Sequence, residues 1–163
     1  MVPSAASATA PAAPVVPPPT LPDPELPPRP TPAQPPSAPE QVAQLVREAV
    51  AEANRLRREH GVRELVIDEK LSEVAQAHAE DMARRNYFSH ETPEGVNPFR
   101  RMQKGGVHFV RAAENIAMGP VTAQRVFALW MDSPGHRQNL LSDAYGRQGL
   151  GFAGGYWVQD FAN

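Results

Sequence analysis

The chain has 163 residues, no cysteine and a net charge of −2 from 16 basic and 18 acidic side chains. The absence of cysteine excludes disulfides, thiolate zinc sites and cysteine nucleophiles. The near balance of charge excludes the electrostatic footprint of a nucleic-acid-binding protein. No apolar run reaches the roughly 20 residues that a membrane-spanning helix needs, so we expect no transmembrane segment.

The first 40 residues differ in composition from the rest. Of the 19 prolines, 15 lie between Pro3 and Pro39. Proline lacks an N–H and fixes φ, so residues 1–40 are predicted to form a disordered, Pro/Ala-rich spacer. Residues 41–163 hold 15 acids and 15 bases and are long enough for one domain with a core. We expect a monomer.

The N-terminus has neither the basic nor the apolar region of an intact signal peptide. Either the chain is cytoplasmic or a leader has been cut from it. A long Pro/Ala tether ahead of one domain favours the second alternative. We therefore expect an extracellular or cell-envelope-associated protein whose leader is absent from this chain.

Two helices are predicted at the start of the domain. Residues 37–40 form a capping-box pattern with Pro39 in the first turn, and an apolar stripe at helical spacing follows until Gly61. Asp68 is predicted to cap the second helix, and His78 lies in its apolar stripe as a core histidine. Residues 65–67 are apolar but too few to assign.

The middle of the domain alternates turns with short elements. Residues 88–98 are rich in turn residues, and a short helix is predicted over 98–104, ended by two glycines. Residues 112–117 read as extended or mixed. Thr122 is predicted to cap a third helix. After it, Pro134 and Gly135 predict a tight turn with His136 at its mouth.

The C-terminus reads as a β-hairpin. GLGFA (149–153) and YWVQDFA (156–162) flank the turn pair Gly154–Gly155. GLGFAG also matches G-x-G-x-x-G, but a dinucleotide site needs a helix after this motif, and residues 156–162 resemble a strand. Helices followed by strands indicate an α+β fold with an antiparallel sheet. Trp130 and Trp157 are predicted to pack in its core.

Three polar residues lie in unusual settings. His90 falls in the turn-rich segment, Glu114 stands among small apolar residues, and His136 follows the Pro-Gly pair. Two imidazoles and a carboxylate suit either a divalent metal or acid–base chemistry. Spacing alone leaves open whether the three meet. The basic residues Arg100, Arg101 and Lys104 are interpreted as a solvated face.

Four segments carry a family resemblance. NYFSHETPEG, AAENIAMG, WMDSPGHRQNLL and YWVQDFA occur in this order within residues 41–163. Together they resemble the CAP superfamily of cysteine-rich secretory, antigen 5 and pathogenesis-related 1 proteins, and above all its bacterial SCP-like extracellular branch. The resemblance implies a three-layer α-β-α sandwich with a central antiparallel sheet.

The resemblance also implies a cleft with two histidines and two acids. The motifs place His90, Glu114 and His136 in this cleft as ligand-binding residues, and in some members the histidine pair binds a divalent metal such as zinc. The second acid departs from the fuller family pattern. Asp132 is the nearest acid, and it serves either as that second acid or as a cap of the turn.

Three activities are implied by the resemblance. The first is binding of a lipid, a small ligand, a cell-envelope component or a partner through the cleft. The second is metal-assisted, peptidase-like hydrolysis by His90 and His136, with Glu114 polarising a water or orienting an imidazole. The third is a non-catalytic scaffold. No catalytic residue is firmly assigned, because neither an oxyanion hole nor a general base is evident, and this favours binding over an enzyme.

Overall fold

The computed structural model describes residues 37–119 and 121–163. The predicted spacer therefore lies outside the described residues, apart from residues 37–40, which open the first helix. The helices are α1 (Ala38–Glu59), α2 (Glu69–Arg85), α3 (Pro98–Lys104), α4 (Ala123–Asp132) and α5 (Pro134–Leu141). The strands are β1 (Val66–Ile67), β2 (Ala112–Met118), β3 (Arg147–Ala153) and β4 (Tyr156–Ala162).

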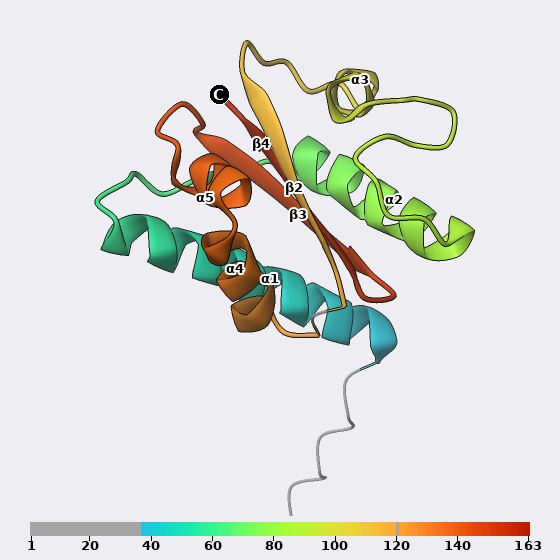
Figure 1. Cartoon of the computed structure of the whole chain (residues 1–163), viewed down its shortest axis with the longest axis horizontal. Helices are drawn as coiled ribbons and strands as arrows, with labels where there is room; N and C mark the ends of the chain where they lie inside the picture. Colours follow the sequence, from blue (N-terminus) through green and yellow to red (C-terminus); the bar gives the residue numbers. More distant parts are fainter. Residues whose placement is uncertain (1–36, 120) are drawn as a thin grey trace, which may run out of the picture. The chain divides into compact units, whose positions relative to one another are not determined.

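These elements form the predicted three-layer α-β-α sandwich (Figure 1). The sheet has the order β1-β3-β4-β2. Helices α1, α4 and α5 lie on one face of it, and α2 and α3 lie on the other. The β2–β4 and β3–β4 pairs are antiparallel as predicted, whereas the two-residue β1 pairs in parallel with β3. Strand β2 is thus an edge strand, next to β4 alone.

The predicted helix starts are confirmed by their caps. The side chain of Asp68 accepts a hydrogen bond from Leu71 N at 3.1 Å, and Thr122 Oγ1 accepts one from Arg125 N at 3.3 Å. At the start of α1, the Glu40 carboxylate accepts from Ser37 N at 2.7 Å. Each bond satisfies an N–H that the first turn of a helix leaves without an intrahelical partner.

The GLGFAG segment forms the end of β3 and the start of a hairpin turn, and its glycines serve two different purposes. Gly154 and Gly155 have φ of 54° and 87°, which suits the two-residue hairpin turns that need positive φ at both positions. Gly149 and Gly151 lie in β3 directly beneath α2. A Cβ at Gly149 would lie 2.1 Å from Leu71 C, and a Cβ at Gly151 would lie 2.4 Å from Gln76 N. The absent side chains let helix and strand backbones touch.

The turn predicted at Pro134–Gly135 is wrong. Pro134 is instead the first residue of α5, and Ser133 lies between α4 and α5. Proline fits this position because the first N–H of a helix lacks an intrahelical partner and the ring fixes a helical φ. His136 therefore lies in the first turn of a helix, which fixes the direction of its side chain more firmly than a loop would.

The core prediction for the two tryptophans is confirmed. Trp130 is 1% exposed and Trp157 is 0% exposed. The Trp130 indole N–H donates to Ile116 O at 3.2 Å, which satisfies its buried donor. Within the described parts of the chain, no helix is both long and apolar enough to cross a membrane.

Candidate functional site

The loop after α2 carries His90 and is held from two sides. Asn86 ends α2 in the left-handed region with φ of 54°, a conformation that asparagine tolerates. His78, buried on α2 as predicted, bonds through Nε2 to Ser89 O at 3.0 Å. Arg101 on α3 donates from Nη1 to His90 O at 2.6 Å. The backbone on both sides of the His90 side chain is therefore fixed by buried or half-buried partners.

Glu114 holds the His90 ring. Its Oε1 lies 2.8 Å from His90 Nδ1, and its Oε2 lies 2.5 Å from Arg101 Nη2. The Glu114 side chain is 2% exposed, whereas that of His90 is 49% exposed. An Nδ1–H that donates to the carboxylate leaves Nε2 of a neutral His90 with a free lone pair. Glu114 thus orients the imidazole through Oε1, while its Oε2 pairs with Arg101.

His136 reaches the same edge of the sheet from the opposite layer. Asn115 follows Glu114 in β2 and points to the other face, where its Nδ2 donates to His136 O at 3.2 Å. Asn139 one turn further along α5 donates to Asn115 Oδ1 at 3.0 Å. Burial lowers the pKa of His136, and the charge of neighbouring His90 lowers it further. That the imidazoles of His90 and His136 share one cleft stays a prediction.

A groove lies between the α3 and α5 sides of β2. It has a volume of about 490 Å³, and its lining includes His90, Asn97, Phe99, Glu114, Asn139 and Tyr145. The described residues that line it include no serine, threonine or cysteine. His136 and Asp132 are not among them. Asp132 is exposed at the last position of α4, and its predicted role as the second acid stays a prediction.

The arrangement does not by itself make a metal centre. No group of three or more His, Cys, Asp or Glu side chains within residues 37–119 and 121–163 could hold a metal ion. The Glu114 side chain is 2% exposed and pairs with Arg101. Without it two imidazoles remain, whereas zinc sites take at least three protein ligands. Zinc on His90 and His136 stays a prediction, and the residues present do not complete its ligand set.

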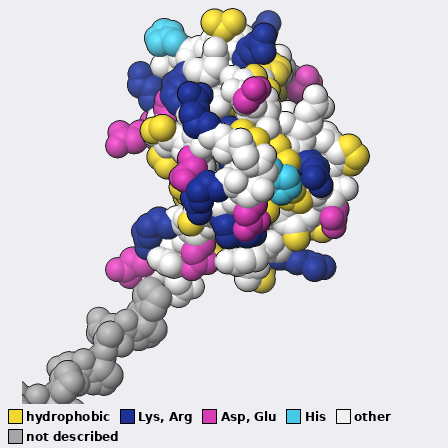
Figure 2. All heavy atoms as spheres, turned by 90° about the vertical axis from the view of Figure 1, so that its left-hand side faces the viewer, with side chains coloured by type: hydrophobic (Ala, Val, Ile, Leu, Met, Phe, Trp, Pro, Cys, Tyr) yellow, Lys and Arg dark blue, Asp and Glu magenta, His cyan; other side chains and the backbone are white. Residues whose placement is uncertain are grey.

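Arg101 is the residue that the sequence interpretation placed wrongly. Arg100 and Lys104 are exposed, as the solvated face requires, but the Arg101 side chain is 11% exposed and pairs with Glu114. Its position three residues after buried Pro98 puts it beside the inward face of α3. That spacing is the signal that separates Arg101 from its basic neighbours. On the face shown in Figure 2, basic and acidic side chains are interspersed.

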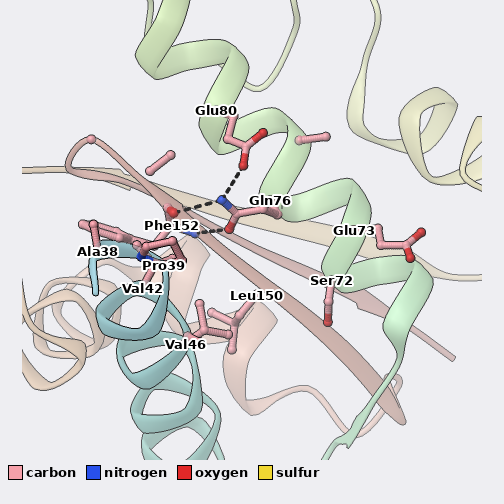
Figure 3. A pocket seen from close by; sticks show the side chains of 14 residues that line it. Ala38, Pro39, Val42, Val46, Ser72, Glu73, Gln76, Glu80, Leu150 and Phe152 are labelled. Atoms are coloured by element: carbon pink, nitrogen blue, oxygen red, sulfur yellow. Dashed lines mark hydrogen bonds between the residues drawn. The ribbon is translucent and has the colours of Figure 1, made fainter. Parts of the chain in front are cut away.

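A second groove lies between α1 and α2 (Figure 3), and its lining includes neither His90 nor His136. It has a volume of about 940 Å³ and a mostly apolar lining that includes Val42, Val46, Leu150 and Phe152. On the α2 side, the Gln76 amide bonds both to Phe152 N at 2.9 Å and to Phe152 O at 3.1 Å. This side chain closes the edge of β3 where β1 has already ended.

The convergence of the two histidines can be tested by titration. We expect His136 to have a pKa below its ordinary value, because burial disfavours the cation and the charge of His90 adds repulsion. The His90→Ala change should raise this pKa, and His60→Ala at the C-cap of α1 should leave it in place. NMR of the imidazole protons measures both. An unchanged His136 titration in His90→Ala would show that the imidazoles do not share a cleft.

Comparisons with known proteins assign the same fold and the same family to the domain. The profile of the CAP family, described as the cysteine-rich secretory protein family, matches residues 50–161. A crystal structure of an extracellular protein containing an SCP domain, from Bacillus anthracis strain Ames, superposes with a TM-score of 0.74 at 29% identity. The match covers 80% of this chain and 45% of that one. An outer surface protein of Borrelia burgdorferi shares the fold, with a TM-score of 0.68 at 23% identity over 74% of this chain and 92% of that one.

Two curated relatives come from Bacillus subtilis strain 168. The uncharacterized protein YkwD is 39% identical over 127 residues, which are 77% of this chain and 49% of that protein. The uncharacterized membrane protein YlbC is 38% identical over 108 residues, which are 66% of this chain and 31% of that protein. This chain therefore spans about half the length of the first relative and about a third of the second.

Proposed function

This chain belongs to the cysteine-rich secretory protein (CAP) family, and we propose that its domain acts outside the cell or at the cell envelope by binding a small polar ligand in the groove beside His90. Support for the location comes from a similar solved structure described as extracellular. The observation that carries the binding role is the half-exposed His90 ring, oriented by a buried carboxylate at the rim of a groove.

The lining of the groove favours a ligand rich in amides and hydroxyls. His90, Asn139 and Tyr145 bring groups that donate or accept hydrogen bonds, and Phe99 brings an apolar ring that is 44% exposed. Pockets of this kind use a few polar groups to orient a ligand against an apolar wall. Envelope glycopeptides have this mixed chemistry, so soluble peptidoglycan fragments are the probe we select.

The same geometry gives less support to hydrolysis. The Glu114 side chain is 2% exposed and already accepts from His90 and Arg101, so little of its carboxylate can reach a water in the groove. The described residues of the lining offer no serine, threonine or cysteine as a nucleophile. His90 remains as a base whose Nε2 is open. The described lining therefore has the polar groups that binding a ligand requires, but it lacks the nucleophile that hydrolysis through a covalent intermediate would require.

The test is a titration of isotope-labelled protein with soluble peptidoglycan fragments. We expect amide shifts to concentrate on the residues around His90, Ala113 and Tyr145. The His90→Gln change should weaken binding about tenfold, the effect of roughly 1.4 kcal/mol. His60→Gln, an equivalent change of an exposed histidine at the end of α1, should leave the affinity unchanged.

Three other outcomes separate the alternatives. Cleavage of the fragments, seen by mass spectrometry and lost in the double variant His90→Ala, His136→Ala, would favour the hydrolase. Partner capture that survives the double variant would favour the scaffold. No shift near His90 with any fragment would refute the proposed polar ligand.

A second candidate is lipid binding in the α1–α2 groove. The observation that favours it is the larger volume of that groove and its apolar lining by Val42, Val46 and Phe152. Vesicles of phosphatidylglycerol are the matching probe. Shifts confined to these residues, with none at His90, would transfer the binding role from the polar groove to the apolar one.

A further inference from the structure

A second carboxyl group lies beneath the site, on the strand next to Glu114. Asp160 in β4 is directly opposite Glu114 in the antiparallel β2–β4 pair, so the two side chains lie on the same face of the sheet. Asp160 is 0% exposed. Neither of its carboxyl oxygens accepts a hydrogen bond from any described side chain or backbone group. An ionised carboxylate in such a place would lack the hydrogen bonds that buried charges require.

No described cation is bonded to Asp160. The charge of Arg101 acts on it from α3, but Arg101 Nη2 is bonded to Glu114 and Nη1 to backbone oxygens. The buried Arg101 Nε has no hydrogen-bond partner, and it donates to neither carboxyl group. His78 faces the sheet from α2, and burial lowers the pKa of its imidazole, which favours the neutral form. On the β3 side, Asp160 is opposite Gly149, which has no side chain. Two carboxyl groups therefore share the positive charge of one arginine.

A protonated, neutral Asp160 would explain both its lack of hydrogen-bond donors and the presence of one arginine near two carboxyl groups. A protonated carboxyl is a donor, and the acceptor at the adjoining strand position is the Glu114 carboxylate. Each carboxylate oxygen has two acceptor sites, so Glu114 accommodates this donor along with His90 and Arg101. The pair then carries one negative charge, which the one positive charge of Arg101 balances. Burial is the first cause that raises the pKa of Asp160 well above its ordinary value, and the charge of Glu114 is the second.

We propose that Asp160 is a neutral acid that donates its proton to Glu114, and that it is a positioning residue for the His90 imidazole. It contacts no groove ligand itself. It acts by fixing the carboxylate that in turn fixes His90, in the same way that outer partners orient a functional histidine. The proposal concerns the support of the site and holds for any ligand.

Asp160→Asn is the first test, because asparagine keeps the shape, stays neutral and still donates. In the wild type, the unfolded chain loses the Asp160 proton above its ordinary pKa of about 3.9, whereas the folded chain keeps it. Wild-type stability should therefore fall as the pH rises above that value, by up to tenfold in the unfolding constant per pH unit, until the folded pKa is passed. Asp160→Asn should lack this component and be at least as stable at pH 7 in urea titrations.

A spectroscopic readout distinguishes this role from simple packing. The wild type should show the infrared band of a protonated carboxylic acid at pH 7, and Asp160→Asn should lack it. The Nδ1–H proton signal of His90 should persist in Asp160→Asn and broaden or disappear in Asp160→Ala, which has no donor. A tenfold larger unfolding constant of Asp160→Asn at pH 7, or the absence of a carboxylic acid band in the wild type, would show that Asp160 is not a neutral acid. An unaltered His90 signal in Asp160→Ala would overturn the positioning role.

Discussion

Adding a single methyl group at Gly149 or Gly151 should destabilise the domain by about 3 kcal/mol or more, the upper end of the range for overpacked cores. The new Cβ would lie 2.1 Å from the backbone carbon of Leu71 at Gly149, and 2.4 Å from the backbone nitrogen of Gln76 at Gly151. Backbone atoms cannot turn aside as a flexible side chain does, so α2 must move away from the sheet. That movement would also displace His78, which supports the His90 loop.

The control for this prediction is Gly135→Ala on α5. A Cβ at Gly135 meets nothing within 4 Å, and alanine restricts the unfolded chain more than glycine does. The same chemical change should therefore leave stability unchanged or raise it. Urea unfolding followed by tryptophan fluorescence measures all three variants, since Trp130 and Trp157 are buried. A loss below about 1 kcal/mol at both strand positions, short of the usual cost of overpacking, would show that α2 accommodates the methyl group.

The elements that the sequence predicts well are those with local signals. The caps at Asp68 and Thr122 and the Gly154–Gly155 turn depend on residues a few positions apart, and local backbone preferences decide them. The α5 helix is not predicted because Pro134 is compatible with either a turn or the first residue of a helix. Packing of α5 against α4 and β2 decides between a turn and a helix. These contacts are made in the folded protein and cannot be inferred from the spacing of residues in the sequence.

The site divides in the same way. His90 and Glu114 are 24 residues apart, and the motifs identify them together because the family resemblance carries long-range information that periodicity lacks. Arg101 and Asp160 are not identified as site residues from the sequence, because each depends on register. Every residue of β4 is buried, so the sequence pattern does not distinguish Asp160 from its neighbours. Only its pairing opposite Glu114 gives it a chemical partner.

Removing the charge of Arg101 should destabilise the domain by about 3–5 kcal/mol, as expected when one member of a buried ion pair is lost. The Arg101→Met change keeps much of the apolar stem but leaves the Glu114 carboxylate, which is 2% exposed, without its cation. It also removes the bonds to His90 O and Val96 O that hold the loop. Arg100→Met on the exposed side of α3 is the matched control and should change stability by no more than about 0.5 kcal/mol.

The origin of the Arg101 effect can be separated by pH and by a second substitution. If uncompensated charge is the cause, acidification should narrow the stability difference between Arg101→Met and the wild type, because a protonated Glu114 needs no cation. Adding Glu114→Gln to Arg101→Met should recover part of the loss, with a coupling of about 1 kcal/mol or more between the two positions. A gap that is constant with pH and simply additive substitutions would instead assign the effect to the loop anchors. In that case Arg101 would support His90 through the backbone of the loop and not through the carboxylate.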